Sequence, residues 1–402
     1  MQSRAPFLFI ILTVALDAIG IGLILPVMPE LISELRGASI SDAAFWGGWL
    51  SFTYAFMQFL CGPALGNLSD RVGRRPVLIV TLTFLGLGYV MMALATSLLA
   101  LFVARFLAGI TGATHATAAA YLADISSRDK RAANFGLIGA AFGVGFILGP
   151  AIGGLLGEVG PRAPFIAAAA VSFANAAFGY FVLPESLKPE NRRAFEWRRA
   201  NPLRAIMAMK RLPQMGGLLG ANFLSVVSNY VYPAIWSFFI IERFGWSSGM
   251  VGLSLAAFGV SSAVVQGWLI RRLLPRLGEW RTAVFGLSMH VLSLLGVAFV
   301  PDGVVLFALM PVAALGAMAG PAVQGMMANR VSDDTQGELQ GVLAAVAGIG
   351  VIISPVLMTG VFRVFTADTA PVYAPGAPFV VAALLAAGAL VLLVRGRRVA
   401  PA

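Results

Sequence analysis

Residues 143–150, with the sequence GVGFILGP, recur 205 residues later as GIGVIISP at residues 348–355. The same offset relates pairs in several other segments: Asp17 and Asn222, Arg71 and Arg276, Gly73 and Gly278, and Gly136 and Gly341. Single glycine matches carry little weight in a chain with 45 glycines, but one spacing shared by several segments indicates an internal repeat. The sequence therefore predicts two similar halves in parallel orientation.

The composition indicates that both halves lie in a membrane. Of the 402 residues, 59% are hydrophobic and 11% are charged, whereas soluble domains carry about 25% charged residues. We predict an all-α membrane protein with twelve transmembrane helices, each near the roughly 20 residues that cross a bilayer. The expected spans are residues 6–28, 45–66, 76–95, 98–122, 134–157, 163–183, 214–240, 248–270, 282–300, 303–328, 338–361 and 376–394. The expected domains are a six-helix half at 1–183, a cytoplasmic linker at 184–212 and a second six-helix half at 213–402.

The net charge of +10 falls mainly in short loops on one side of these spans. Because Lys and Arg accumulate on the cytoplasmic side of membrane proteins, both termini are expected in the cytoplasm and the protein in the inner (plasma) membrane. This distribution explains the charge without a nucleic-acid partner. The linker could lie on the anionic inner leaflet through Phe195 and Trp197, or form a solvated loop.

Asp17 is the only ionisable residue between Phe7 and Met28. An acid in the middle of a span costs on the order of 3 kcal/mol on insertion scales, so it is expected to face a protein or water-filled interior and to be a functional residue. A carboxylate that only hydrogen-bonds a neighbouring helix is the alternative. The run has no small-residue cleavage site, so we interpret it as a retained span.

The loop after the second span reads GNLSDRVGRR at residues 66–75. A simple positive loop explains its arginines but not its acid and paired glycines. The pattern resembles the signature of the major facilitator superfamily, whose fold has two six-helix halves with a substrate site between them. The resemblance implies an interhelical charge network that opens and closes during transport, formed by Asp70, Arg71, Arg74, Asp124 and Arg131.

The fifth expected span is rich in glycine, which lets helix backbones approach closely. It resembles the G-P-x-x-G-G motif of the antiporters in that superfamily, through Gly145, Gly149, Pro150, Gly153 and Gly154. Ordinary tight packing is the alternative explanation.

Three stretches narrow the resemblance to the tetracycline/proton antiporters: LDAIGIGLILPVMPEL, SDRVGRRPVL and ARFLAGITGATHATAAAYLADI. By this resemblance Asp17, Gln58 and Arg105 take the positions of a functional acid, amide and arginine. Arg105 could instead snorkel to the outer headgroups. The second half departs from the family, because Ser262 replaces a histidine and His290 replaces an aspartate. His290 is predicted to carry protons, with a hydrogen-bonded packing role as the alternative.

Polar and aromatic residues of the seventh span share one helical face, and two further amides lie in spans eight and ten. They are predicted to line a substrate cavity, or alternatively to bond between helices. These residues are Asn222, Asn229, Tyr232, Trp236, Gln266 and Gln324.

These features favour a monomeric, proton-coupled exporter of amphipathic small molecules, tetracycline-like or other drugs, that works by alternating access. The chain lacks a G-x-x-x-x-G-K-[ST] phosphate loop, and it lacks H-E-x-x-H and nucleophile-elbow motifs, which argues against ATP as driver and against an enzyme. The single cysteine, Cys61, predicts no disulfide framework or metal site, and no cofactor is expected. Transport of a metabolite such as a sugar or siderophore, a channel and a membrane enzyme are the alternatives.

Overall fold

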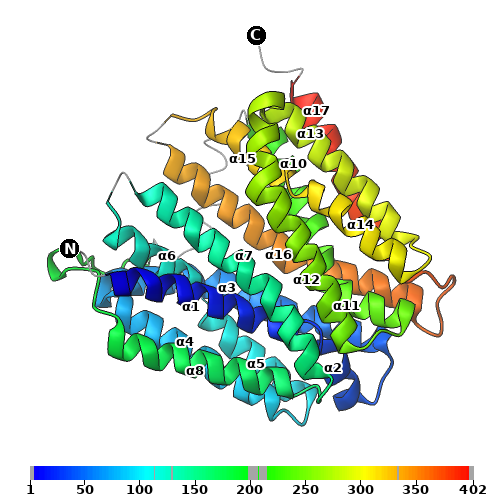
Figure 1. Ribbon diagram of the computed structural model, residues 1–402, viewed down its shortest axis with the longest axis horizontal. Coiled ribbons are helices and arrows are strands. Elements are labelled where there is room, and N and C mark those ends of the chain that lie inside the picture. The colour runs from blue at the N-terminus through cyan, green and yellow to red at the C-terminus, as the bar shows by residue number, and fades with distance from the viewer. Residues whose placement is uncertain are drawn as a thin grey trace. The chain divides into compact units, whose positions relative to one another are not determined.

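The computed structural model describes residues 4–112, 114–127, 130–197, 207, 215–332 and 335–397 (Figure 1). Every regular element in these residues is a helix, which confirms the predicted all-α fold. The first half contains α1 (Arg4–Ile24), α2 (Met28–Arg36), α3 (Ile40–Val72), α4 (Arg74–Ala93), α5 (Leu98–Ile110), α6 (Thr114–Ile125), α7 (Arg131–Gly157), α8 (Ala163–Val182) and the 3-10 turn η1 (Pro189–Asn191). The second half contains α10 (Gly216–Asn229), α11 (Val231–Phe244), α12 (Ser248–Val264), the π-helical turn η4 (Val265–Leu269), α13 (Ile270–Ala298), α14 (Gly303–Gly316), α15 (Ala319–Ala328), α16 (Gln336–Thr366) and α17 (Ala377–Arg397).

Nine stretches of the described residues are long and apolar enough to cross a membrane. One of them, the 51-residue stretch Ser248–Ala298, covers two of the predicted spans. Gly278 separates these two spans, because its φ of 75° and ψ of 165° interrupt the helix. The two spans that remain correspond to α3 and to the pair α5 and α6. The described helices are therefore consistent with twelve spans.

The helices of the two halves break at matching positions. Leu25 follows the end of α1 and Tyr230 follows the end of α10, and these residues are 205 apart. Gly112 lies between α5 and α6 and Ala317 lies between α14 and α15, again 205 apart. The offset found in the sequence thus also relates the backbone irregularities, which supports a structural repeat.

The chain divides into two compact units. Unit 1 contains Met1–Ala38, Thr53–Pro202 and Trp246–Ala256, and unit 2 contains Ser39–Phe52, Leu203–Gly245 and Ala257–Ala402. Two helices, α3 and α12, therefore contribute residues to both units.

In unit 1, α1 packs backbone to backbone on α7. A methyl group on Gly145 would lie 2.7 Å from the Cβ of Ala18, and one on Gly149 would lie 2.8 Å from the Cα of Gly22. A methyl group on Gly153 would collide with the Leu23 carbonyl. Side chains larger than hydrogen would push α1 away, so these glycines set the distance between the two helices.

The first turn of α12 is held in unit 1 by two carboxylates. The Ser248 hydroxyl donates to Glu30 Oε1 at 2.9 Å, and the Gly249 N–H donates to Glu158 Oε1 at 2.7 Å. Hydrogen bonds from the Ser247 side chain and from Gly249 lower the pKa of Glu158. The N-terminus of α12 is therefore capped by an acid of α2 and by the acid that follows α7, in the polarity that the helix dipole favours.

In unit 2, the apolar core lies among α10, α13, α15, α16 and α17. Its buried members include Leu287, Val323 and Leu339. The part of α3 that belongs to this unit contacts α16, where Asp42 pairs with Arg363 at 3.5 Å.

Residues 184–197 of the predicted linker are non-helical apart from η1, and the one further described residue of the linker, Met207, is helical. Trp197 is 80% exposed and its ring meets Phe195 edge to face at 5.1 Å. Residues 198–206 and 208–212 of that prediction lie outside the described residues, and the choice between a membrane-surface segment and a solvated loop stays a prediction.

Candidate functional site

Asp17 lies in the middle of α1, and its side chain is half-buried in unit 1. Within the described part of the chain its carboxylate forms no hydrogen bond or ion pair. It interacts electrostatically with Tyr89 of α4, a residue only 2% exposed. The Tyr89 hydroxyl lies 3.0 Å from the place where a Cβ would stand on Gly20, one turn after Asp17.

Arg105 of α5 faces the same region. Its Nη2 donates to the Met28 sulfur at 3.7 Å, and its guanidinium lies 5.8 Å from the centre of the Tyr54 ring. It also interacts electrostatically with Tyr89. Its Nε–H is buried and has no hydrogen-bond partner in the described residues. A buried donor without an acceptor costs free energy, so this group favours an incoming acceptor.

Gln58 of α3 hydrogen-bonds the backbone at the break between α5 and α6. Its Nε2 donates to the Gly112 carbonyl at 2.7 Å and reaches the Tyr54 hydroxyl at 3.4 Å. The carbonyl at a helix break lacks its usual partner within the helix, so the amide compensates for it. Gln58 therefore links α3 to the irregular backbone beside Arg105.

The structure thus brings together Asp17, Gln58 and Arg105, the acid, amide and arginine expected from the sequence. Two tyrosines complete the group, Tyr54 and Tyr89, and sequence reasoning missed both. Tyr89 carried a weak signal, because it is the only tyrosine in the expected span at residues 76–95. We call these five residues the polar cluster of unit 1.

The cavity residues expected in the second half do not form a comparable group. The predicted face of span seven is interrupted, because the helix ends at Asn229 and restarts at Val231. Asn222 is buried, whereas Asn229, Gln266 and Gln324 are exposed. Gln266 lies within η4, where the helix widens to a π-turn, an irregularity often found at functional sites.

Tyr232 and Trp236 lie in an aromatic cluster of unit 2. The Tyr232 ring stacks on Phe258 at 5.4 Å and lies 5.7 Å from Trp236. Phe379 of α17 contacts both, with ring centres 6.0 and 6.2 Å away. Tyr232 and Trp236 are 8% and 5% exposed, so they serve as core residues in this conformation.

His290 of α13 is 5% exposed and joins three helices. Its Nε2 lies 3.1 Å from the Ser228 hydroxyl of α10, and that hydroxyl donates to the Ala382 carbonyl of α17 at 2.8 Å. Because the serine proton is used on Ala382, the serine oxygen accepts from His290, and Nε2 carries a proton. This geometry supports the packing alternative, and a proton-carrying role for His290 stays a prediction.

The charged turn between α3 and α4 contains a buried arginine between two acids. Arg74 pairs with Asp70 at 2.6 Å through Nη2 and with Asp124 of α6 at 3.2 Å through Nε. Its Nη1 also donates to the Ser69 hydroxyl at 2.5 Å. Arg74 is 9% exposed. We call Asp70, Arg74 and Asp124 the charge triad.

Two residues of the expected network remain, Arg71 and Arg131. Arg71 is exposed and forms no ion pair with the residues that the structure describes. Arg131 begins α7, but its side chain lies outside the described residues. The partner of Asp70 is thus the second arginine of the turn, not the first.

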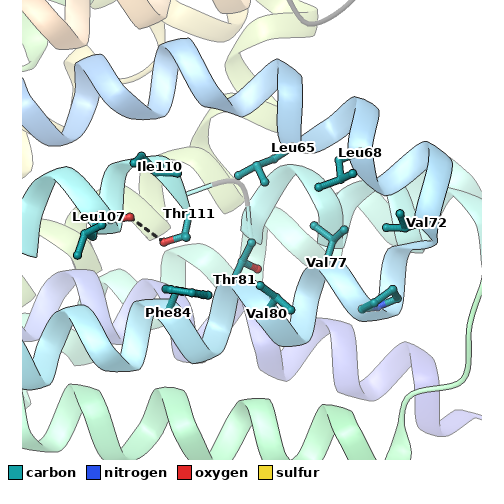
Figure 2. A pocket seen from close by; sticks show the side chains of 11 residues that line it. Leu65, Leu68, Val72, Val77, Val80, Thr81, Phe84, Leu107, Ile110 and Thr111 are labelled. Atoms are coloured by element: carbon teal, nitrogen blue, oxygen red, sulfur yellow. Dashed lines mark hydrogen bonds between the residues drawn. The ribbon is translucent and has the colours of Figure 1, made fainter. Parts of the chain in front are cut away.

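An apolar groove of about 360 Å³ lies between α3, α4 and α5 (Figure 2). Figure 2 shows Leu68, Val80 and Phe84 along its walls. Its two hydroxyls are already bonded, since Thr81 donates to the Leu78 carbonyl and Thr111 to the Leu107 carbonyl. The groove therefore offers hydrocarbon contacts only, and it is separate from the polar cluster of unit 1.

Comparison with known proteins agrees with this geometry. The family model of the Major Facilitator Superfamily matches residues 10–355 and 218–402. The chain is 40% identical to the class C tetracycline resistance protein of Escherichia coli, over 90% of this chain and 91% of that protein. It is 37% identical to the class G protein of Vibrio anguillarum, over 89% and 91% of the two chains.

The fold resembles a bacterial homologue of the human lysosomal transporter Spinster in its inward-facing, unoccupied form. The TM-score is 0.79 at 18% identity, and 99% of this chain and 98% of that chain are covered. The repeat, the charged turn and the polar cluster thus occur in a chain that these comparisons place with transporters. The chain belongs to the Major Facilitator Superfamily, in the group that contains the tetracycline resistance proteins.

Proposed function

We propose that this protein is a proton-coupled exporter of amphipathic drug-like molecules, tetracycline-like compounds among them. The observation that carries the proposal is Asp17, an acid in the middle of a transmembrane helix that no described residue neutralises. An intramembrane acid without a partner is costly unless it binds a proton or a cation, so it is suited to proton coupling.

The substrate region would include the polar cluster of unit 1. Arg105 offers a free N–H for an anionic or carbonyl oxygen, and the Tyr54 ring gives a flat apolar surface beside it. An apolar surface with a few convergent polar groups suits a bulky, partly charged molecule. The related tetracycline resistance proteins support tetracycline as the first substrate to examine.

Alternating access would use the halves 1–183 and 213–402 as the two moving parts, with the linker at 184–212 between them. The shared offset of the helix breaks supports this division, since interrupted helices are typical of the binding regions of transporters. The basic loops support an orientation with both termini in the cytoplasm. We assign the protein to the inner membrane as a functional monomer, with protons, a small molecule and the lipid bilayer as its partners.

The proposal is tested in everted membrane vesicles with radiolabelled tetracycline as probe. Acidifying the lumen should drive uptake of the label, and a protonophore should abolish the uptake. Counterflow against unlabelled tetracycline separates a carrier from a channel, because a channel cannot exchange label against a gradient. Uptake that does not respond to the pH gradient would contradict proton coupling.

A further inference from the structure

The segment Pro184–Trp197 lies on the charged turn of unit 1 through contacts along its length. Near its start, the Tyr121 hydroxyl donates to the Pro184 carbonyl at 2.8 Å and the Ser186 hydroxyl donates to Asp124 at 3.1 Å. Near its end, the Arg193 N–H donates to the Asp70 carbonyl at 3.0 Å and the Asn67 side chain donates to the Glu196 carbonyl at 2.7 Å. We call this segment the strap.

Glu185 of the strap caps α4. Its carboxylate accepts the N–H groups of Arg74 at 2.8 Å and Arg75 at 3.3 Å, and also the N–H of Leu187 at 3.0 Å. The first N–H groups of a helix lack partners within the helix and carry the positive end of its dipole. A carboxylate is therefore a favourable cap, and this one comes from a segment more than a hundred residues away along the chain.

Gly73 shows that the contact is close. Its φ of 114° is a conformation that favours glycine, and a Cβ there would collide with the Glu185 carboxylate. The glycine of the charged turn thus makes room for the cap. Because Arg74 follows directly, the cap also fixes the backbone that aims Arg74 at Asp70 and Asp124.

The strap is bound at both ends and bridges a cavity in between. The cavity has a volume of about 640 Å³ and is lined by the charge triad on one side and by Leu187, Glu190 and Arg193 of the strap on the other. Leu187 is 7% exposed and anchors the strap by its apolar side chain. The side chains of the charge triad therefore border a cavity in which they can change partners, while the hydrogen bonds of the strap fix the backbone around them.

The repeat-related site in unit 2 has a different charge arrangement. The positions 205 residues after Gly73, Arg74 and Asp124 are Gly278, Glu279 and Asn329. Gly278 again has a positive φ, of 75°, but here the Glu279 carboxylate accepts from the Asn329 amide at 2.9 Å. The same turn thus exists in both units, and the arginine between two acids belongs to unit 1.

We propose that Glu185 is a positioning residue of the transport switch: by capping α4 it docks the strap and holds Arg74 in the charge triad. The linker then acts as a part of the switch instead of a passive connection. The transport consequence rests on the proposed export function, whereas the docking itself does not. Loss of the cap should leave substrate binding intact and slow the change between conformers, since the strap is separate from the polar cluster of unit 1.

The docking is tested without transport, on the full-length protein in detergent. Glu185→Ala should raise hydrogen exchange at the amides of Arg74 and Arg75 about tenfold, and should speed tryptic cleavage after Arg192 and Arg193 by a similar factor. Glu185→Gln should have an intermediate effect, because it keeps an acceptor oxygen and loses the charge. Glu190→Gln is the matched control, an acid of the same strap that makes no hydrogen bond with described residues, and it should resemble the wild type.

The switch role is tested in the everted vesicles. Glu185→Ala should lower the rate of pH-driven tetracycline uptake about tenfold and change the equilibrium Kd for tetracycline less than twofold. Unchanged exchange and proteolysis in Glu185→Ala would overturn the docking. Increased exchange with a normal uptake rate would overturn the switch role and leave the docking in place. Wild-type vesicles that take up no tetracycline would contradict the proposed substrate, while the exchange result would still decide the docking.

Discussion

Asp17 and Arg105 are oppositely charged groups of one unit that form no ion pair with each other or with any other described residue. If they paired, each would neutralise the other, and neither would respond strongly to a proton or a substrate. Tyr89, which is 2% exposed, interacts electrostatically with both. Because the two groups form no ion pair, both stay available to the proton and the substrate of the proposed transport cycle.

Asp17→Asn tests the acid directly. The variant should lose pH-driven uptake of tetracycline by at least about tenfold, because the amide cannot take up and release a proton near neutral pH. Exchange of labelled for unlabelled substrate without a pH gradient should persist. Asp302→Asn, at a capping position where the amide oxygen can still accept from Val304 and Val305, is the control for expression and insertion. Uphill accumulation by Asp17→Asn would show that another group couples protons.

At the scale of elements, the charged turn shows how one buried side chain organises two helix ends. Arg74 holds Asp70 at the end of α3 and Asp124 at the end of α6, while its own helix begins at that residue. Without the arginine, two carboxylates would face each other across a small gap. The turn therefore depends on Arg74 for its conformation.

The pair Arg74→Ala and Arg71→Ala separates the triad from general positive charge. Arg74→Ala should slow uptake about tenfold, which corresponds to about 1.4 kcal/mol in the barrier of the limiting step. Arg71→Ala should stay within about twofold of the wild type, because Arg71 is exposed and outside the triad. Initial rates at matched protein level give the comparison. If both variants lost the same share of the uptake rate, the general positive charge of the turn, and not the charge triad, would explain the effect.

The capped start of α12 gives a prediction about pH. Its hydrogen bonds lower the pKa of Glu158 below the ordinary value of 4.5, so the folded state stabilises the ionised form. This contribution is complete above the ordinary pKa and is lost as the pH falls through the lowered one. Glu158→Gln should therefore reduce the Tm at pH 7 and reduce it less at pH 3. Thermal unfolding in detergent at the two values measures this, and an equal decrease at both would contradict it.

At the scale of the whole molecule, hydropathy and the repeat were enough to predict the helical fold, because burial in a membrane leaves a strong pattern in composition. Hydropathy and the repeat did not predict where the helices break, because a break at Gly112 or Tyr230 does not interrupt the apolar stretch of sequence. The pairing of Asp70 with Arg74 was also not predicted, because both Arg71 and Arg74 are close enough to Asp70 along the chain to pair with it. The docking of the strap was not predicted either, because most of its hydrogen bonds involve backbone groups, which are the same for every residue type.

Under the proposed function, residues of the second half should also affect the substrate range. The tetracycline antiporters that the sequence resembles carry an aspartate where this chain has His290, which here packs against Ser228. An imidazole is neutral or cationic near pH 7, so it cannot attract a cation or a metal chelate by charge. We expect tetracycline resistance several-fold weaker than that given by the class C relative at equal expression, and stronger export of other amphipathic compounds. Minimum inhibitory concentrations in a pump-deficient strain decide this, and equal tetracycline resistance would contradict it.

The exchange of segments between the two compact units has a consequence for assembly. Unit 1 takes residues 246–256 from the second half of the chain, and unit 2 takes residues 39–52 from the first. Two fragments produced from separate genes, 1–200 and 201–402, would each lack a piece of its own fold that only the other supplies. Such mutual dependence favours reassociation, as in domain swapping. Co-expressed fragments should therefore purify together through a tag on one of them, and each fragment expressed alone should be degraded.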